Sequence, residues 1–333
     1  MPGDALEAGA SIIGTGTTME GINQNPAYYE YTYDTAWHKE AQDLESWFKG
    51  YASRRYGAAA NKDAEDAWEI LRNNVYNYAG CGSFGGYHDG SGVEWKVYGK
   101  PPVCALPDPK QVSAAWSLLV KVGGIIDPVK YATLNYDIVN TGREVLAQLI
   151  TLQEATLTTA VGKADKKTAM ASGLVLLDMY ADLDKLLACD ANFLIGPWIA
   201  KAKSWANDSD APEQFYEWQA RSQVSTWWPV APSDVEDWTA NYTKSPPLDG
   251  YANKHWNGLV RDFYAMRVQC YVDQVSIDLP ANKFNQANMT TCAIKAEMSF
   301  TQGTKTTYAV APTDSLTVDL STKLLAKYTK LLE

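Results

Sequence analysis

The chain has 333 residues, a formal net charge of −10, and 46% hydrophobic against 20% charged side chains. This is ordinary globular composition, so a large buried core is expected and extended disorder is excluded. The acidic balance and the lack of any Lys or Arg run argue against a nucleic acid partner, because phosphate binding needs clustered cations.

The first 38 residues combine an apolar run with a polar turn. Residues 10–13 are mostly apolar and lead into two glycines, after which Glu20 stands in a turn with three amides, Asn23, Gln24 and Asn25. A buried strand delivers a catalytic side chain to the mouth of a parallel barrel in this way, although an ordinary loop has the same composition. Since a (β/α)₈ barrel takes about 250 residues, residues 1–38 are predicted to be at most its last strand and helix.

From residue 39 onward the apolar spacing is helical. Leu44, Trp47, Phe48 and Tyr51 share one helical face, and Gly57 is expected at the C-cap. A second helix is predicted to begin at Asp63 as its N-cap. Residues 80–110 are rich in Gly, Pro and Ser, which predicts a long loop.

The remaining two thirds predict a helical bundle. Asp127 and Pro128 are expected to open a long helix that pairs, through a turn near Gly162, with a helix over residues 163–189 as an antiparallel hairpin. Further helices are predicted over residues 193–206, 212–228, 251–274 and 320–331. A strand pair is predicted over residues 297–300 and 305–310, with Gly303 between them. The fold class is therefore mainly α, a helical bundle domain over residues 39–333 preceded by the end of an incomplete (β/α)₈ barrel over residues 1–38.

Cysteine and histidine usage predicts neither a metal site nor a cofactor. The five cysteines lack zinc-type spacing, and there are only three histidines. Cys189 and Cys270 lie in helical apolar patterns and are interpreted as small core residues. Cys81 and Cys104 flank the glycine-rich loop and are the candidate pair for a bridge. Dinucleotide and serine-nucleophile motifs are also missing.

The chain contains three candidate glycosylation sites but no recognisable targeting signal. No window approaches the roughly 20 apolar residues of a membrane span, and the first residues do not form a signal peptide. Asn207, Asn241 and Asn288 each begin an Asn-x-Ser/Thr triplet, which by itself is weak evidence for a secretory route.

The turn and the helical region together resemble a known family. Residues 18–26 read TMEGINQNP, residues 28–38 read YYEYTYDTAWH, and residues 251–274 begin YANKHWNGLV. These stretches resemble α-N-acetylglucosaminidase, glycoside hydrolase family 89, at the end of its barrel and in its helical C-terminal domain. The resemblance implies that Glu20 is the nucleophile of a retaining hydrolase acting on terminal α-linked N-acetylglucosamine, heparan sulfate type glycans being the implied substrate class. It also implies a lysosomal or secreted location and allows a homo-oligomer in the full-length enzyme.

Further contacts to the glycan are expected around the same site. The amides Asn23, Gln24 and Asn25 stand beside Glu20, while Trp227, Tyr251, Asn253 and Trp256 lie in or before the well-matched stretch; single large aromatics at helical spacing are otherwise core residues. The family carries a Trp-Tyr pair where residues 104–107 here read Cys-Ala-Leu-Pro, which puts the aromatic platform in doubt.

The second catalytic carboxyl group is missing from the sequence. In the family the general acid belongs to an Asn-Glu dipeptide on an earlier strand, and this chain contains none. We therefore expect part of a longer enzyme, a split gene product or a degenerate paralogue, inactive as an isolated chain. The alternative is a non-catalytic helical module for sugar binding or assembly.

Overall fold

The structure is a computed structural model, and its regular elements are helices. It describes residues 9, 11, 13–17, 26–57, 61–76, 107–126, 128, 130–208, 211–227, 252–279, 283–303, 306–313 and 317–332. Within these ranges no strand occurs, and one parallel bridge joins Leu194 to Asn257. The predicted mainly α class is confirmed.

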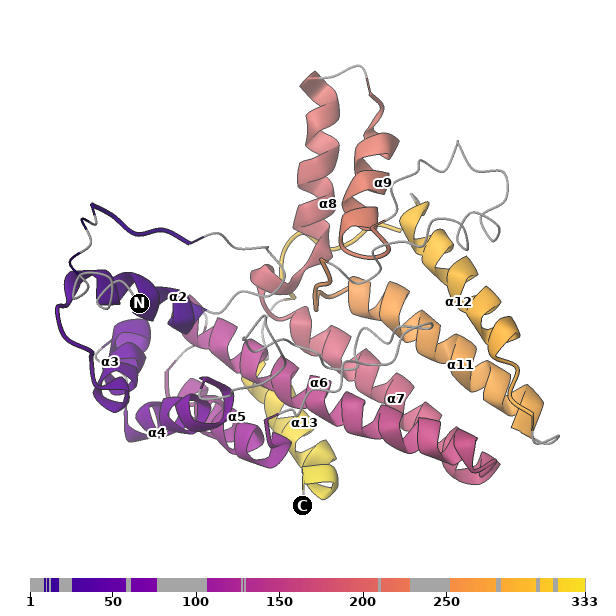
Figure 1. Ribbon diagram of the computed structural model, residues 1–333, viewed down its shortest axis with the longest axis horizontal. Coiled ribbons are helices and arrows are strands. Elements are labelled where there is room, and N and C mark those ends of the chain that lie inside the picture. The colour runs from indigo at the N-terminus through magenta and orange to yellow at the C-terminus, as the bar shows by residue number, and fades with distance from the viewer. Residues whose placement is uncertain are drawn as a thin grey trace.

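A long antiparallel hairpin forms the centre of the bundle (Figure 1). Its arms are α6 (Ala132–Gly162) and α7 (Lys166–Leu187), so the predicted pairing and the turn near Gly162 are confirmed. Asp165 caps α7 by accepting from the backbone N–H of Thr168 at 3.1 Å. The start predicted at residues 127–128 is wrong, because the first helical residue of α6 is Ala132.

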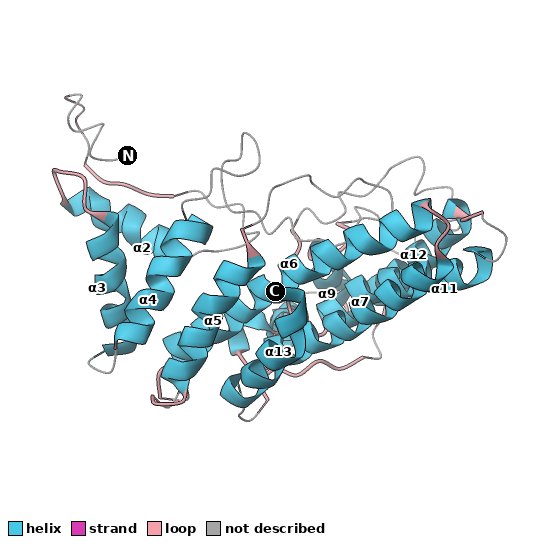
Figure 2. Cartoon of the chain, turned by 90° about the horizontal axis from the view of Figure 1, so that it is seen from below, coloured by secondary structure: helices cyan, strands magenta, loops and turns pink. Residues whose placement is uncertain are grey.

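The other helices cover this hairpin from two sides. One side carries α5 (Pro109–Gly123) and α13 (Thr317–Leu332), with α4 (Lys62–Leu71) packed on α5, and the other carries α11 (Ala265–Asp278), with α12 (Gln286–Thr301) packed on α11. Figure 2 shows α3, α4 and α5 in this order toward α6, with α2 beside α3 and α4. The pair α8 (Ile195–Ser204) and α9 (Glu213–Gln223) projects from the bundle in Figure 1.

Close packing at the centre depends on a glycine in α6. A Cβ atom on Gly142 would lie 2.5 Å from the Trp116 ring of α5 and 2.8 Å from Leu186 of α7. Both neighbours are buried side chains, so neither has room to move away. Gly142 therefore permits three helices to meet at one point.

The N-terminal helices are joined to the bundle by aromatic packing and a buried carboxylate. Tyr31 of α2 (Pro26–Asp34) packs edge to face on Trp47 of α3 (Leu44–Tyr56), with ring centroids 5.1 Å apart. Asp137 of α6 accepts two hydrogen bonds from the Arg55 guanidinium, at 2.6 and 2.8 Å, and one from the Tyr56 hydroxyl at 2.8 Å. These bonds connect α3 to the central hairpin.

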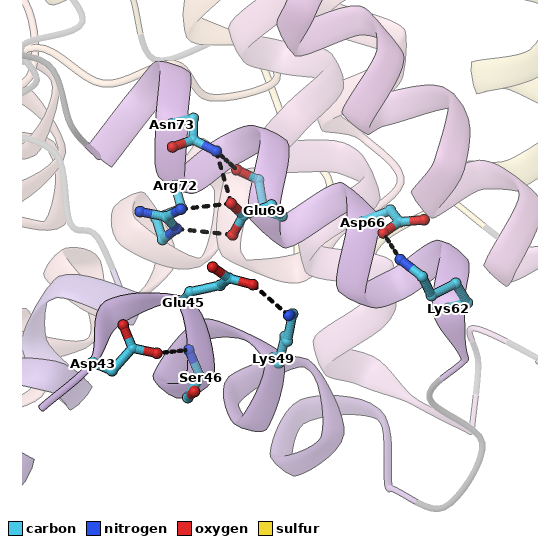
Figure 3. A network of polar contacts seen from close by, with 9 residues as sticks. All are labelled: Asp43, Glu45, Ser46, Lys49, Lys62, Asp66, Glu69, Arg72 and Asn73. Atoms are coloured by element: carbon cyan, nitrogen blue, oxygen red, sulfur yellow. Dashed lines mark hydrogen bonds and ion pairs between the residues drawn. The ribbon is translucent and has the colours of Figure 1, made fainter.

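The surfaces of α3 and α4 carry a further polar network, drawn in Figure 3. Asp43 caps α3 by accepting from the backbone of Ser46 at 2.9 Å, and Gly57, at φ 66°, ends that helix as predicted. The Glu69 carboxylate accepts hydrogen bonds from the Arg72 guanidinium three residues later. The remaining charged pairs in the figure join residues four positions apart on a helix. This network is helix capping and surface ion pairing, and it builds no site.

Three local predictions are wrong. The N-cap of α4 is Asn61, whose side chain accepts from Ala64, and not Asp63. The helix expected over residues 251–274 begins at Leu259, continues as a π-helical turn, η9 (Val260–Tyr264), and then becomes α11. The strand expected over residues 297–300 lies inside α12, and residues 306–309 have no regular structure.

Two smaller predictions also change. Cys270 is not simply a core residue, because it forms a disulfide with Cys292 that joins α11 to α12. Cys189 is buried as predicted, and it forms no disulfide among the described residues. Of the strand predicted over residues 10–13 only Ser11 and Ile13 are described; neither lies in a strand, and Ile13 is fully exposed.

Candidate functional site

The structure describes three of the predicted contact residues. Trp227, Asn253 and Trp256 are placed, whereas the predicted nucleophile Glu20 lies outside the described residues. The other predictions that lie outside them are Asn23, Gln24, Asn25, Tyr251, Asn241 and the Cys81–Cys104 pair. The site can therefore be built only on the helical side, from residues 252–258 and the helices beneath them.

Residues 252–258 are anchored by backbone and side-chain hydrogen bonds. The N–H of Asn257 donates to the carbonyl of Phe193 at 2.7 Å, and the N–H of Ile195 donates back to Asn257 at 3.3 Å. The Asp184 carboxylate of α7 accepts from the Asn257 side chain at 2.8 Å and from the N–H of Gly258 at 2.7 Å. Because Asp184 is itself buried, this extended segment is held rigidly across the bundle.

Gly258 is required where this segment turns into η9. Its φ of +87° lies in the left-handed region, which side chains other than glycine rarely adopt. A Cβ atom there would also lie 2.5 Å from the Tyr308 ring. The glycine thus determines where residues 252–257 enter the bundle.

The anchored segment places His255 against Arg143 in the interior. The two side chains are buried, and Arg143 Nη1 lies 3.0 Å from His255 Nδ1. A guanidinium only donates, so Nδ1 accepts and the neutral imidazole carries its proton on Nε2. Burial, with the nearby cations Arg143 and Lys254, lowers the pKa of His255 well below its ordinary value of 6.5, so the ring is neutral.

Glu144, beside Arg143 on α6, is a buried carboxyl group. Its Oε1 accepts from the Gln148 amide at 2.9 Å, and its Oε2 lies 3.5 Å from Arg143 Nη2. Burial raises the pKa of Glu144 to about 8, so the group is mainly protonated at neutral pH. The buried cluster therefore combines a cation, a neutral imidazole and a carboxylic acid.

The predicted contact residues differ in exposure. Asn253 is buried in the same segment as His255, two residues away. Trp256 is half-buried and packs against the Trp198 ring of α8, with centroids 6.1 Å apart. Trp227 is half-buried at a positive φ of 49°, with its N–H donating to the carbonyl of Ser222 at 2.6 Å. Asn253 and Trp256 thus lie on the same anchored segment as His255.

Sequence reasoning did not identify Arg143, Glu144 or His255 as a cluster. A signal was present in α6, where Arg143 and Glu144 follow Gly142 inside an otherwise apolar seam. Charged residues are rarely buried without partners, so two adjacent charges at a predicted core position indicate a polar network. Their partner His255, 112 positions away, was recognisable only in three dimensions.

One cavity of the described part of the chain is lined by residues other than the predicted contacts. A cavity of about 360 Å³ lies between α8, α9 and residues 306–310, and Lys203 and Glu217 line it. These two side chains form an ion pair at 3.4 Å, and Glu217 also binds Arg221 at 2.7 Å.

Among the described residues no group of His, Cys, Asp and Glu side chains is arranged to hold a metal ion. In the same part of the chain no helix is long and apolar enough to cross a membrane.

Comparison with solved structures defines the class of this fold. It resembles a doubly substituted family 89 glycoside hydrolase from Clostridium perfringens in complex with GlcNAc-alpha-1,4-galactose, with a TM-score of 0.81 and 20% identity over 99% of this chain. The same bacterial hydrolase in complex with PUGNAc gives a TM-score of 0.78 and 22% identity over 98% of the chain. The chain spans 37% and 36% of those structures. The fold is thus that of the helical domain of this hydrolase class.

The family follows from the sequence comparison. Residues 47–327 match the family described as Alpha-N-acetylglucosaminidase (NAGLU) C-terminal domain, so the chain belongs to that family. It is also 29% identical to human Alpha-N-acetylglucosaminidase over 325 residues, which is 96% of this chain and 40% of the human protein. The chain therefore spans about two fifths of the length of this relative.

Proposed function

We propose that the chain is part of a retaining α-N-acetylglucosaminidase that hydrolyses terminal α-linked N-acetylglucosamine, with glycans of the heparan sulfate type as the substrate class. The observation that carries this proposal is family membership over residues 47–327. The shared fold with a hydrolase whose complex contains GlcNAc-alpha-1,4-galactose supports it. A lysosomal or secreted location and a homo-oligomeric full-length enzyme belong to the same proposal.

The proposed nucleophile is Glu20. Its carboxylate would attack the anomeric carbon while the bond to the leaving oxygen breaks, which gives a covalent glycosyl-enzyme that water then hydrolyses. A second carboxyl group about 5 to 5.5 Å away must protonate the leaving oxygen and later activate the water. This sequence contains no Asn-Glu dipeptide to supply that acid, so the isolated chain is proposed to be inactive.

The proposed division of labour assigns residues 1–38 to the end of the catalytic barrel and residues 39–333 to the helical domain. Glu20 and the amides Asn23, Gln24 and Asn25 would contact the reacting sugar from the barrel side. Trp227, Tyr251, Asn253 and Trp256 would contact it from the helical side. The anchoring of residues 252–258 by Asp184 supports the second group, because a rigid segment positions such contacts well.

An assay on an aryl α-N-acetylglucosaminide tests the proposal. The isolated chain is expected to release no phenol, and turnover that disappears in Glu20→Gln would overturn the proposed inactivity. The same substitution in a form that also carries a catalytic barrel is expected to abolish turnover. The matched control is Glu40→Gln, an exposed acid outside the turn, which should keep activity. If both variants retain activity, Glu20 is not the nucleophile.

The alternative is a non-catalytic helical module for sugar binding or assembly. The chain spans only about two fifths of its relative, and its described residues form a large continuous core. Titration of the isolated chain with N-acetylglucosamine separates the two functions. Saturable binding that Asn253→Ala weakens, without turnover in any form, would favour the module.

A further inference from the structure

One face of α12 points to solvent along most of its length. Asn288, Cys292, Lys295 and Ser299 are exposed, and their spacing of four, three and four residues places them on one helical face. The opposite face, which carries Met289, Ala293 and Phe300, is buried against the bundle. In Figure 1 this helix lies at the edge of the molecule.

An N-glycosylation triplet begins at Asn288 on this exposed face. The triplet is Asn288-Met289-Thr290, and α12 keeps the side chain of Asn288 outside the core. Its backbone N–H is bound by Asn285 Oδ1 at 3.1 Å, whereas its side-chain amide makes no hydrogen bond within the described part of the chain. A glycan on this amide would therefore displace no contact of the fold.

A disulfide lies one helical turn away. Cys292 bonds to Cys270, which is buried in α11, while Cys292 itself is exposed. Residues separated by four positions on a helix have Cβ atoms about 5–6 Å apart, so a branched sugar chain at Asn288 would cover the Cys292 sulfur. A disulfide that persists also indicates an oxidising compartment, where N-linked glycans are added.

We propose that Asn288 carries an N-linked glycan that shields the Cys270–Cys292 disulfide from reductants. The Asn288 amide nitrogen bonds to the anomeric carbon of an oligosaccharide supplied by a lipid-diphosphate donor. The bond from that carbon to the diphosphate oxygen breaks, the lipid diphosphate leaves, and the amide loses one proton. This role is independent of the hydrolase function proposed above.

Occupancy is tested on the full chain secreted from a eukaryotic cell line. Peptide mass spectrometry after enzymatic removal of glycans in ¹⁸O water is expected to find Asn288 converted to ¹⁸O-labelled Asp. Asn288→Gln and Thr290→Ala should each abolish the label, and the second variant keeps the asparagine itself. A folded, secreted chain with unmodified Asn288 overturns the proposal.

Shielding is tested by reduction with dithiothreitol. A thiolate of the reductant attacks the sulfur of the exposed residue Cys292, and Cys270 leaves as a thiolate. The second thiol of the reductant then closes a cyclic disulfide and leaves two protein thiols. Alkylation followed by mass spectrometry is expected to show reduction several-fold slower in the glycosylated chain than in Asn288→Gln or the deglycosylated chain.

The control removes the other described acceptor. Asn207 is exposed in η7 (Trp205–Asp208), which follows α8 and not α12 in the chain, so Asn207→Gln should leave the reduction rate unchanged. Equal reduction rates with and without the glycan on Asn288 would overturn the shielding role, and a slower rate restricted to the Asn288-glycosylated forms supports it.

Discussion

Replacing Asp137 by Ala should disconnect α3 from the central hairpin. The substitution removes both carboxylate oxygens that hold the Arg55 guanidinium, at 2.6 and 2.8 Å, and the acceptor for the Tyr56 hydroxyl at 2.8 Å. The Arg55 side chain is only 11% exposed, so its charge would remain largely desolvated and without this partner. Removing one member of a buried ion pair typically costs about 3–5 kcal/mol.

Urea unfolding, monitored by circular dichroism, measures this loss of unfolding free energy. With a slope of about 3 kcal/mol/M, a loss of about 3 kcal/mol lowers the unfolding midpoint by about 1 M. Asp137→Asn keeps the shape and one acceptor oxygen and should lose less, because a neutral hydrogen bond contributes about 1 kcal/mol.

The double variant Arg55→Met with Asp137→Leu separates the two causes of instability. It removes the stranded charge and should recover much of the stability lost in Asp137→Ala. A loss below about 1 kcal/mol in Asp137→Ala would refute the reasoning, since the pair would then be replaced by water at no large cost.

Three further perturbations have defined outcomes. Burial raises the pKa of Glu144 to about 8 from 4.5, so the folded chain holds a proton that the unfolded chain loses, and stability should fall as pH rises through this window. Glu144→Gln should remove up to about 1.4 kcal/mol per pH unit of that slope, measured by urea unfolding at pH 6.5 and 8; an unchanged slope contradicts the burial argument. Gly258→Ala, at a positive φ and against the Tyr308 ring, should lose at least about 1–3 kcal/mol in thermal unfolding, and a stability within 0.5 kcal/mol of wild type, as for an ordinary surface change, would contradict it. The double variant Cys270→Ala with Cys292→Ala removes a disulfide that joins positions 22 residues apart, and its free energy of unfolding should fall by about 3 kcal/mol. As a check, the wild-type chain with this disulfide reduced should have the same stability as the double variant.

Helix content was accessible from the sequence because the apolar spacing is local. The seam of α6 and α7, the turn near Gly162 and the C-cap at Gly57 each depend on residues within one or two turns of chain. The boundaries were less accurate. Asn61 rather than Asp63 caps α4, since both residue types accept hydrogen bonds from helix N-termini and the pattern does not choose between them.

The errors arose where a distant partner decides the local structure. From the sequence, residues 252–257 were predicted to form the first turns of a helix. In the structure Asp184 and the bridge to Leu194 hold them extended until Gly258. Cys270 read as a core residue, and its partner Cys292 became evident only when α11 and α12 lay side by side. Glu297 read as part of a strand, yet it is buried in α12 and accepts from Arg267 at 2.7 Å.

The sequence by itself determined the mainly α class, the central hairpin and the family resemblance from which Glu20 is proposed as the nucleophile, since each rests on residues adjacent in the chain. The tertiary structure alone decided that Arg143, Glu144 and His255 meet in one buried cluster and that Asn288 stands one turn from the exposed disulfide residue Cys292. The physical reason is that ionisation, hydrogen bonding and accessibility depend on burial and on partners contributed by other helices, which sequence spacing does not specify.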